Sequence, residues 1–295
     1  MARMGISKKP SVVTLPVTPP PWPSILEFLA GAFPNIPRDR WAERIRDGKV
    51  LDERGAPITA LTAYRPAARL FYFREVEREP VIPFAERIVF QNDDILVADK
   101  PHFLPVVPGG RYVNECLEQR LRDRTGLAGL VPVHRIDRET AGLVLCSLNP
   151  KTRSLYHRLF MHGEIEKTYH AVAEAPEPPR ATRWTVENRI VRGEPRFRMK
   201  TVPGEVNARS IVRFAGRRGQ RARFELQPLT GKTHQLRLHL SSLGFPIVHD
   251  RCYPVLQAER ADDFARPLQL VARRLRFRDP VSGGDMSFES GFELT

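Results

Sequence analysis

The sequence predicts an α+β fold with a mixed, largely antiparallel sheet and flanking helices, and three observations lead to this class. First, the chain has 295 residues, of which 41% are hydrophobic, so a packed core is expected. Second, residues 210–214 and 221–226 flank a glycine-containing turn, and the second run alternates apolar and polar residues, which is typical of an antiparallel hairpin. Third, strand-like runs dominate the middle of the chain, with helical segments expected to pack around them.

Residues 1–21 are expected to form a flexible tail. This segment is basic and rich in proline, with Lys8 and Lys9 near its start and three consecutive prolines at its end. It shows no hydrophobic periodicity, and such a composition favours an extended, mobile chain. It also lacks the apolar stretch of a signal peptide.

Residues 22–82 are expected to form a separate small module that contains both helices and strands. Ser24 begins a capping-box sequence at the start of a first helix, and Pro37 is placed to begin a second one. Short strands are predicted at residues 49–51 and 70–73. The module would therefore have the order helix, helix, hairpin.

Residues 83–295 are expected to form the main domain, which a proline-containing linker joins to the module. A buried strand is predicted at residues 94–101, where a proline stops the apolar run. A helix is predicted at residues 113–124. Asn149 is expected to cap a further helix, which Gly163 would end.

The charge and the cysteine content narrow the class of protein. The formal net charge is +13 at pH 7 and the isoelectric point is about 10.2, which is typical of proteins that bind polyanions such as RNA. No apolar run approaches the roughly 18 residues that a membrane span requires, so no membrane association is expected. The three cysteines are far apart and match neither a disulfide framework nor a zinc pattern. We therefore expect a cytoplasmic protein without a metal.

The run from His134 to Gly142 contains the most informative single residue, Asp137. Its carboxylate lies between Arg135 and Arg138 in the sequence, and nearby positive charge favours the ionised form. An ionised aspartate in a loop between ordered segments is a candidate nucleophile. Taken by itself, the same pattern also fits a surface ion pair.

Two further segments strengthen the functional interpretation. One is the run 167–171, Lys-Thr-Tyr-His-Ala, and the other is the run 230–240, Thr-Gly-Lys-Thr-His-Gln-Leu-Arg-Leu-His-Leu. Together with the Asp137 run, and in this order along the chain, they resemble the motifs of the RluA-type pseudouridine synthases. The resemblance covers roughly residues 84–295.

The resemblance is incomplete at several positions. Ile136 stands where the family usually has Leu, Ala141 where it has Ser, and Lys232 where it has Arg, and residues 268–272 replace a segment of the Leu-His-Ala type. These changes remove no residue with an assigned chemical role, but they obscure the subgroup and hence the substrate. Residues 22–82 resemble, more loosely, an S4-type RNA-binding module, with a plain scaffolding domain as the alternative.

The resemblance implies catalytic roles for three residues. Asp137 would attack C1′ of the ribose or C6 of the uracil, or would assist an elimination. Arg237 would form an ion pair with Asp137 and keep it ionised. Tyr169 would stack on the base and take part in proton transfer at C5. From the residues alone, Tyr169 also fits a half-buried aromatic of a strand, and Arg237 also fits a surface pair or a helix cap.

The same blocks contain candidates for substrate binding. A uridine in structured RNA has to be extruded before it can react, and Arg135 is placed to fill the vacated stack. Thr233 is expected to cap the helix that carries Arg237, and Gln235 is expected to face the RNA. The histidines lack the spacing of a zinc site and are expected to be structural or phosphate-facing. The substrate-binding candidates are His134, Arg135, Thr140, Lys167, Thr233, His234 and Gln235.

The function implied by the resemblance is the isomerisation of specific uridines to pseudouridine in structured RNA, either ribosomal or transfer RNA. The reaction needs no redox change and no external water, so neither a cofactor nor a metal is expected, and no obligate protein partner is evident. The alternative is a non-catalytic RNA-binding or ribosome-assembly factor with the same fold, although intact Asp137, Tyr169 and Arg237 argue against it. A glycosidase is a third interpretation, but it needs two carboxylates across the bond, and Glu139 is too close in sequence to supply the second.

Overall fold

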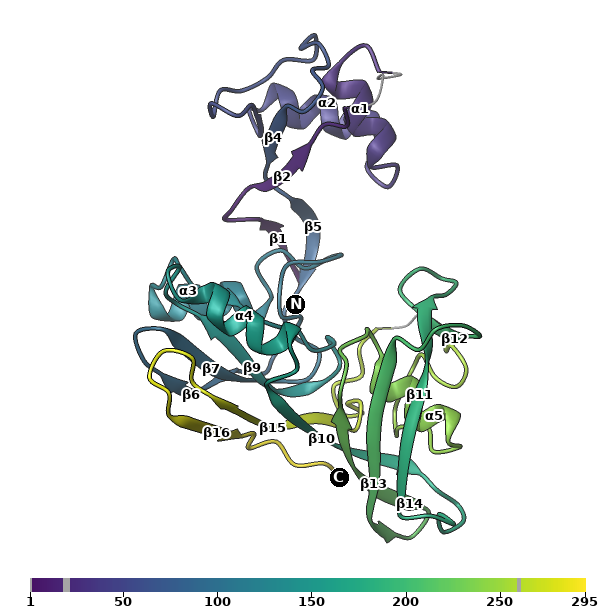
Figure 1. Ribbon diagram of the computed structural model, residues 1–295. Coiled ribbons are helices and arrows are strands. Elements are labelled where there is room, and N and C mark those ends of the chain that lie inside the picture. Colours follow the sequence, from purple (N-terminus) through teal and green to yellow (C-terminus); the bar gives the residue numbers. More distant parts are fainter. Residues whose placement is uncertain (1, 18–21, 259–260) are drawn as a thin grey trace. The chain divides into compact units, whose positions relative to one another are not determined.

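The computed structural model describes residues 2–17, 22–258 and 261–295, and these fold into two compact units (Figure 1). The N-terminal unit contains the chain up to Val81 together with the short segment Gly110–Asn114. The large unit contains Ile82–Gly109 and Glu115–Thr295. No helix of the described residues is long and apolar enough to cross a membrane.

In the N-terminal unit two helices and a three-stranded antiparallel sheet share one core. Ser24 caps α1 (Ile25–Ala32) by accepting a hydrogen bond from the Glu27 amide, as the capping-box sequence predicts. Pro37 directly precedes α2 (Arg38–Arg46). The order of the sheet is β2 (Ser11–Thr14), β4 (Arg69–Tyr72), β3 (Val50–Leu51). The buried side chains of this core include Leu15, Leu29, Trp41, Val50 and Leu70.

The expectation of a flexible tail is wrong for the described part of residues 1–21. Strand β1 (Ala2–Ile6) pairs with β5 (Glu75–Pro80), and β2 pairs with β4, in both cases antiparallel. Leu15 is 1% exposed. Composition was misleading here because both strands are short and obtain their hydrogen-bond partners from distant parts of the chain. Residues 18–21, which include the proline run, lie outside the described residues.

The large unit is organised around one sheet, to which eleven strands of the described residues contribute. The continuous path is β12-β11-β13-β14-β10-β15-β9-β7-β6, with β16 beside β15 and β8 beside β9. Neighbouring strands are antiparallel except β9 and β15, which are parallel, so the predicted mixed, largely antiparallel sheet is confirmed. The strands are β6 (Arg87–Gln91), β7 (Ile95–Lys100), β8 (Val131–Pro132), β9 (Ala141–Ser147), β10 (Glu166–Glu174), β11 (Arg183–Arg192), β12 (Met199–Val202), β13 (Ala208–Arg218), β14 (Arg221–Pro228), β15 (Leu270–Arg278) and β16 (Asp285–Glu289).

The helices of the large unit differ in detail from the predicted ones. The helix predicted at 113–124 is α3 (Leu117–Thr125), and it starts later because residues up to Asn114 belong to the N-terminal unit. Asn149 does not cap α4 (Arg153–Met161). Its side-chain oxygen instead accepts from the Lys151 amide, which forms a turn ahead of the helix. The third helix is α5 (Gln235–Ser242).

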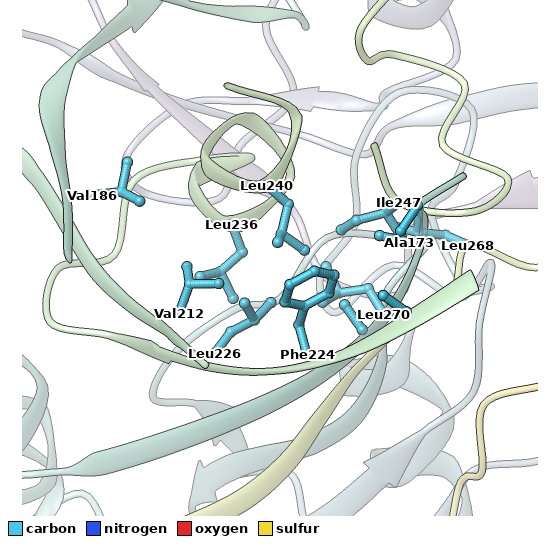
Figure 2. Packing of buried hydrophobic residues seen from close by; sticks show 13 residues of the cluster. Ala173, Val186, Val212, Phe224, Leu226, Leu236, Leu240, Ile247, Leu268 and Leu270 are labelled. Carbon is cyan, nitrogen blue, oxygen red and sulfur yellow. The ribbon is translucent and has the colours of Figure 1, made fainter. Parts of the chain in front are cut away.

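The sheet and α5 enclose the core on which the remaining geometry depends. Side chains alternate along β14, and Phe224 and Leu226 point toward Leu236 and Leu240 of the helix (Figure 2). Val212 of β13 completes the contact. Burial of each such side chain is worth roughly 1.5–3 kcal/mol. This packing therefore sets the position of α5 and of the arginine that it carries.

Candidate active site

A pocket of about 810 Å³ lies in the large unit, lined by the loop before β9, the start of β10 and the loop that leads into α5. The three sequence blocks therefore meet at one place. Among the described residues that line this pocket, Asp137 is the only carboxylate. The basic side chains around it include Arg135, Arg138, Lys167, Lys232 and Arg237.

The loop that carries Asp137 is held from its own C-terminal end. The Thr140 amide donates to the Asp137 carbonyl oxygen at 3.2 Å. Gly142 then enters β9 with φ of 114°, and a Cβ atom at this position would lie 2.3 Å from the carbonyl oxygen of Ala272. Glycine is therefore required at this position, because β9 approaches β15 closely here. The parallel pairing of these two strands marks the end of the loop.

A buried lysine at the end of β7 holds the same loop through a backbone carbonyl group. The Lys100 ammonium at the end of β7 donates to the carbonyl oxygens of Pro101, Leu104 and Arg138 at 2.9, 2.7 and 3.2 Å. Burial lowers the pKa of Lys100 to about 7, against the attraction of Glu139 and Asp137. Sequence reasoning missed this residue, although a lysine at the end of a strand predicted to be buried was a usable signal.

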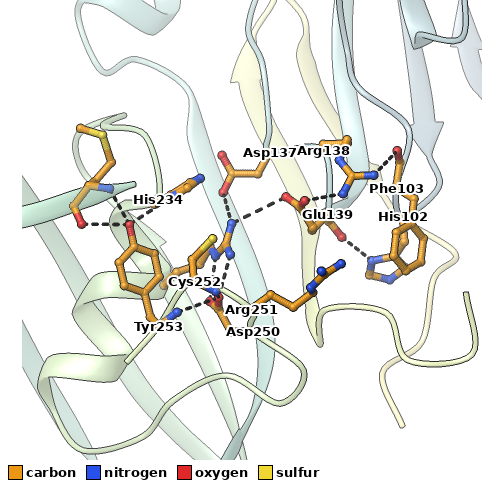
Figure 3. A network of polar contacts seen from close by, with 12 residues as sticks. His102, Phe103, Asp137, Arg138, Glu139, His234, Asp250, Arg251, Cys252 and Tyr253 are labelled. Carbon is orange, nitrogen blue, oxygen red and sulfur yellow. Dashed lines mark hydrogen bonds and ion pairs between the residues drawn. The ribbon is translucent and has the colours of Figure 1, made fainter. Parts of the chain in front are cut away.

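Arg237 lies in the first turn of α5, and its side chain is 2% exposed. Its Nε and Nη2 donate to the two oxygens of Asp250 at 2.8 and 2.7 Å (Figure 3). Its Nη1 lies 3.5 Å from Asp137 Oδ2 and 3.7 Å from Glu139 Oε2. Burial disfavours the cation, but the hydrogen bonds and charge of Asp250, with the charges of Asp137 and Glu139, outweigh burial and raise the pKa of Arg237.

Asp250 is the principal site residue that the sequence analysis did not find. Its side chain is 1% exposed and also accepts from the backbone amides of Cys252 and Tyr253. The expected contact between Arg237 and Asp137 is present, but it is the longer and weaker of the two. The available signal was an acidic residue two positions after the apolar run 245–248.

Tyr169 projects into the pocket from β10, where its backbone pairs with Leu226 and Ala272. The register of β10 against β15 shifts between Thr168 and Tyr169. Burial, and then the charge of Asp137, raise the pKa of the phenol. Tyr169 is therefore a neutral phenol near pH 7 and can act as a stacking surface or a hydrogen-bond donor.

The histidines of the blocks have mainly structural environments. His134 Nε2 accepts from the Leu145 amide at 3.1 Å, and its ring stacks on Phe160 with centroids 4.5 Å apart. Burial, and secondarily Lys167, lower the pKa of His134 to about 3. His234 shares a hydrogen bond with the Tyr253 hydroxyl at 2.9 Å. Of the two roles expected for these rings, the geometry favours the structural one.

The start of α5 differs from the prediction. Thr233 does not cap the helix: the N-cap residue is His234, with φ of 55° and no side-chain cap bond. The Gln235 amide is bonded within the protein, with Oε1 accepting from Thr230 and the Lys232 amide. Its Nε2 donates to Arg209 O and Ser210 Oγ. Gln235 therefore braces this loop, although its side chain was expected to face RNA.

Three cations of the pocket remain available to a ligand. In the described structure, the side chains of Arg135, Lys167 and Lys232 make neither a hydrogen bond nor an ion pair, and Arg135 and Lys232 are exposed. Burial lowers the pKa of Lys167. Thr140, by contrast, is 2% exposed at the edge of the pocket. The described residues contain no group of three or more His, Cys, Asp or Glu side chains placed to hold a metal ion.

A pocket lined by one carboxylate, one buried arginine and several further basic side chains fits an enzyme that acts on RNA. Comparison with known proteins identifies the class of enzyme. Residues 94–242, about half of the chain, match the family model described as RNA pseudouridylate synthase. The chain belongs to this family, and its relatives place it among the RluA-type enzymes. It is thus an RNA pseudouridine synthase, an isomerase.

Particular relatives extend the match over most of the chain. The dual-specificity RNA pseudouridine synthase RluA of Haemophilus influenzae is 30% identical over 224 residues, which cover 72% of this chain and 94% of that protein. An uncharacterized RNA pseudouridine synthase of Synechocystis is 27% identical over 230 residues, covering 78% of this chain and 79% of its own length. The mitochondrial tRNA pseudouridine(32) synthase of Saccharomyces cerevisiae is 33% identical over 181 residues, 59% of this chain but 38% of the yeast protein.

A solved structure agrees with the fold. The human protein called RNA pseudouridylate synthase domain containing 1 matches with a TM-score of 0.59 at 24% sequence identity. The match covers 73% of this chain and 87% of the human chain. It supports the architecture of the large unit described above.

Proposed function

We propose that this enzyme isomerises a uridine of structured transfer or ribosomal RNA, with Asp137 as its essential carboxylate. The observation that carries the proposal is the position of Asp137 as the lone acid among the described lining of a cationic pocket. RNA brings negative phosphates to such a pocket, while the neutral uracil can approach the acid. The names of the yeast and Haemophilus relatives, which refer to tRNA and to dual specificity, support the choice of RNA.

The chemistry is balanced within the substrate. The bond between N1 of uracil and C1′ of ribose breaks, a bond between C5 and C1′ forms, the proton on C5 leaves, and N1 gains a proton. Asp137 attacks C1′, attacks C6, or assists an elimination at the sugar. In each route a carboxylate with a free oxygen is needed, and the single 3.5 Å contact to Arg237 leaves lone pairs on Asp137 for the substrate.

The neighbouring residues have complementary roles. Arg237, held by Asp250, supplies a fixed positive charge that favours the ionised form of Asp137. Tyr169 supplies a flat, neutral ring against which an extruded uracil stacks. Arg135, exposed and unpaired in the described structure, fills the stack that the base vacates.

The test is the near-isosteric variant Asp137→Asn. We expect it to abolish isomerisation while RNA affinity stays within a few-fold, because the change removes charge but little volume. Product formation is measured by the release of tritium from C5-labelled uridine, and affinity by fluorescence anisotropy. The matched control is Asp93→Asn, at an exposed aspartate, which should leave both measurements unchanged. Full activity of Asp137→Asn would overturn the assignment, and inactivity of the unmodified enzyme on all RNA tested would favour the non-catalytic alternative.

A further inference from the structure

The residue after the proposed nucleophile is held by a distant segment of the chain. The two terminal nitrogens of Arg138 donate to the two oxygens of Asp262 at 2.9 and 3.0 Å, which is a two-point pair. The Asp262 side chain is 7% exposed and that of Arg138 is 23% exposed. Such a pair is geometrically specific and is shielded from water on the aspartate side.

This pair is the counterpart of the pair between Arg237 and Asp250. Glu139 connects the two arginines: its Oε1 accepts from Arg138 at 2.8 Å, and its Oε2 lies 3.7 Å from Arg237 Nη1 (Figure 3). Arg138 and Arg237 thus each have an aspartate of their own. Within the described structure, the Asp137 carboxylate itself has only the long contact to Arg237.

The segment that carries Asp262 is also anchored by aromatic packing. The ring of Phe264 packs edge-on against Phe103, with centroids 5.1 Å apart, and against Phe84 at 5.5 Å. Phe103 is 5% exposed, and its carbonyl oxygen lies 3.5 Å from Arg138 Nη1. Phe264 and Phe84 are each 37% exposed, so this contact holds the segment at the surface while the Asp262 side chain, 7% exposed, faces Arg138.

An unrestrained Arg138 would disturb the nucleophile. It is adjacent to Asp137 in the chain and lines the same pocket. A guanidinium freed from Asp262 would be attracted to the nearest carboxylate with an open face, and a two-point pair would occupy both oxygens of that carboxylate. We propose that Asp262 is a positioning residue that holds Arg138 away from Asp137 and so keeps the carboxylate open to substrate. The proposal rests on the proposed role of Asp137.

The charged and titratable neighbours of this site come from several elements. Arg138 faces Asp262, Glu139 and, more weakly, the charge of Lys100, and Arg251 lies 3.9 Å from Asp262. The charge of Asp137 acts on the titratable groups Lys100 at the end of β7, Tyr169 of β10 and His234 before α5, and Arg237 of α5 is its ion-pair partner. The other basic residues in the described lining of the pocket are His134, Arg135, His157, Lys167 and Lys232.

The first test is Asp262→Asn, which keeps the shape but removes the charge. We expect the single-turnover rate at saturating RNA to fall by roughly tenfold to a hundredfold, the size of effect that misplacement at a reacting centre produces. We also measure the single-turnover rate as a function of pH. The acid limb of this profile should move to lower pH, because a cation moved toward Asp137 favours the ionised form of Asp137. A merely structural loosening would lower the rate without moving that limb. The matched control, Asp263→Asn at the exposed neighbour, should change neither.

The second test asks whether Asp262 acts through Arg138. The double variant Arg138→Gln/Asp262→Asn has no guanidinium to misplace, so it should be faster than Asp262→Asn alone and should regain the wild-type acid limb. Asp262→Glu restores the charge and should give an intermediate rate. Thermal unfolding is measured for every variant, and if Asp262→Asn does not fold, the comparison is made with Asp262→Glu and its double variant.

The results separate this proposal from the proposed function. An unchanged rate and profile in Asp262→Asn, or a double variant no faster than the single one, would overturn the positioning role. If the Asp262 variants give either of these results and Asp137→Asn is inactive, only the positioning role fails. If Asp137→Asn is fully active, the assignment of the nucleophile fails, whatever the Asp262 variants do.

Discussion

At the scale of single residues, the site separates the group proposed to react from the groups that hold it. Arg237 makes its short hydrogen bonds with Asp250 and its long contact with Asp137. A short two-point pair to Asp137 would have tied up both of its oxygens. Tyr169 stays protonated near neutral pH because burial raises its pKa, so it contributes a ring and a neutral hydroxyl.

Substitution of Arg237 tests its support of Asp137. Arg237→Ala should lower the single-turnover rate more than Arg237→Lys and should move the acid limb of the pH profile upward. Removal of the guanidinium leaves the buried Asp250 without a cation and takes positive charge from Asp137. Lysine restores the charge but not the planar two-point contact, so its profile should be intermediate.

The measurement is a single-turnover pH profile of the three proteins on one saturating RNA. Thermal unfolding is recorded in parallel, because an unpaired buried carboxylate also costs stability of about 3–5 kcal/mol. A normal rate with an unshifted limb in Arg237→Ala would contradict the support of Asp137 by Arg237.

At the scale of elements, the junction of β9 and β15 decides where the Asp137 loop ends. This junction is parallel and short, with the pairs Val271 to Ala141 and Ala272 to Gly142. The close approach at Gly142 makes it sensitive to one methyl group. The loop and its Asp137 therefore depend on a backbone contact as much as on side chains.

Gly142→Ala should destabilise the enzyme and lower its activity more than Gly216→Ala. Both glycines have positive φ, 114° and 132°, so both substitutions bring backbone strain of about 1–3 kcal/mol. At Gly142 the new Cβ also meets Ala272 O at 2.3 Å, whereas at Gly216 the described structure places no such neighbour within 4 Å of a Cβ. Urea unfolding and single-turnover rates measure the two effects. Equal losses of stability and rate in both variants would show that the close approach of Gly142 to Ala272 has no influence on either quantity.

The N-terminal helices bear on the expectation of an S4-like RNA-binding module. Three arginines of α2 already have acidic partners: Arg38 pairs with Glu27, Arg40 with Glu43 and Glu77, and Arg44 with Glu75. Deletion of residues 1–82 is also not a clean test of RNA binding. Glu79 accepts hydrogen bonds from the amides of Val113 and Asn114, and these would lose their acceptor. RNA binding by this unit stays a prediction that point substitutions test better.

At the scale of the whole molecule, the net charge of +13 predicts strongly salt-dependent RNA binding. The logarithm of the affinity should fall linearly with the logarithm of salt concentration, because bound cations release counterions from phosphate. Arg135→Gln and Lys232→Gln should each reduce the slope by about one if the side chain contacts a phosphate. The control, Arg40→Gln, removes a cation that is already paired. Anisotropy titrations measure the slopes, and binding insensitive to salt would refute the electrostatic interpretation.

Buried and partly buried histidines predict a loss of stability in acid. Burial lowers the pKa of His102, His134 and His239 to about 4, 3 and 4, from an ordinary value of 6.5. Between pH 6.5 and about 4 the unfolded chain therefore binds protons that the folded chain does not, so the free energy of unfolding falls as pH falls. Burial would raise the pKa of Glu139, but the charges of Arg138 and Arg237 outweigh burial and lower this pKa to about 2. Glu139 therefore adds a further loss of folding free energy as the pH falls below 4.5.

Urea unfolding between pH 7.5 and 4 measures this dependence. His239→Asn removes one titrating group and should flatten the curve, whereas His162→Asn, at an exposed position, should not. A free energy of unfolding that stays constant down to pH 4 would contradict the interpretation that these histidines are neutral in the folded protein.

Local signals in the sequence were sufficient for much of this protein. The cap of α1 at Ser24 and the alternation along β14 are interactions between near neighbours, so a short window of sequence contains both partners. The hairpin pattern and the strand-like runs were enough to predict the fold class. The order of the three motif blocks was enough to predict the family and to name Asp137, Tyr169 and Arg237 as candidate site residues, which all line one pocket. The net charge likewise pointed to a polyanionic partner without reference to the fold.

Tertiary structure alone decided which groups hold the reactive ones. Asp262 and Lys100 meet the Asp137 loop, and Asp250 meets Arg237, through contacts that no local spacing encodes. The strands near the N terminus and the segment Gly110–Asn114 gain their order in the same way, from partners elsewhere in the chain. The physical reason is that hydrogen bonds and ion pairs depend on distance and burial in space. A sequence window contains the donor or the acceptor in these cases, and folding brings the two together.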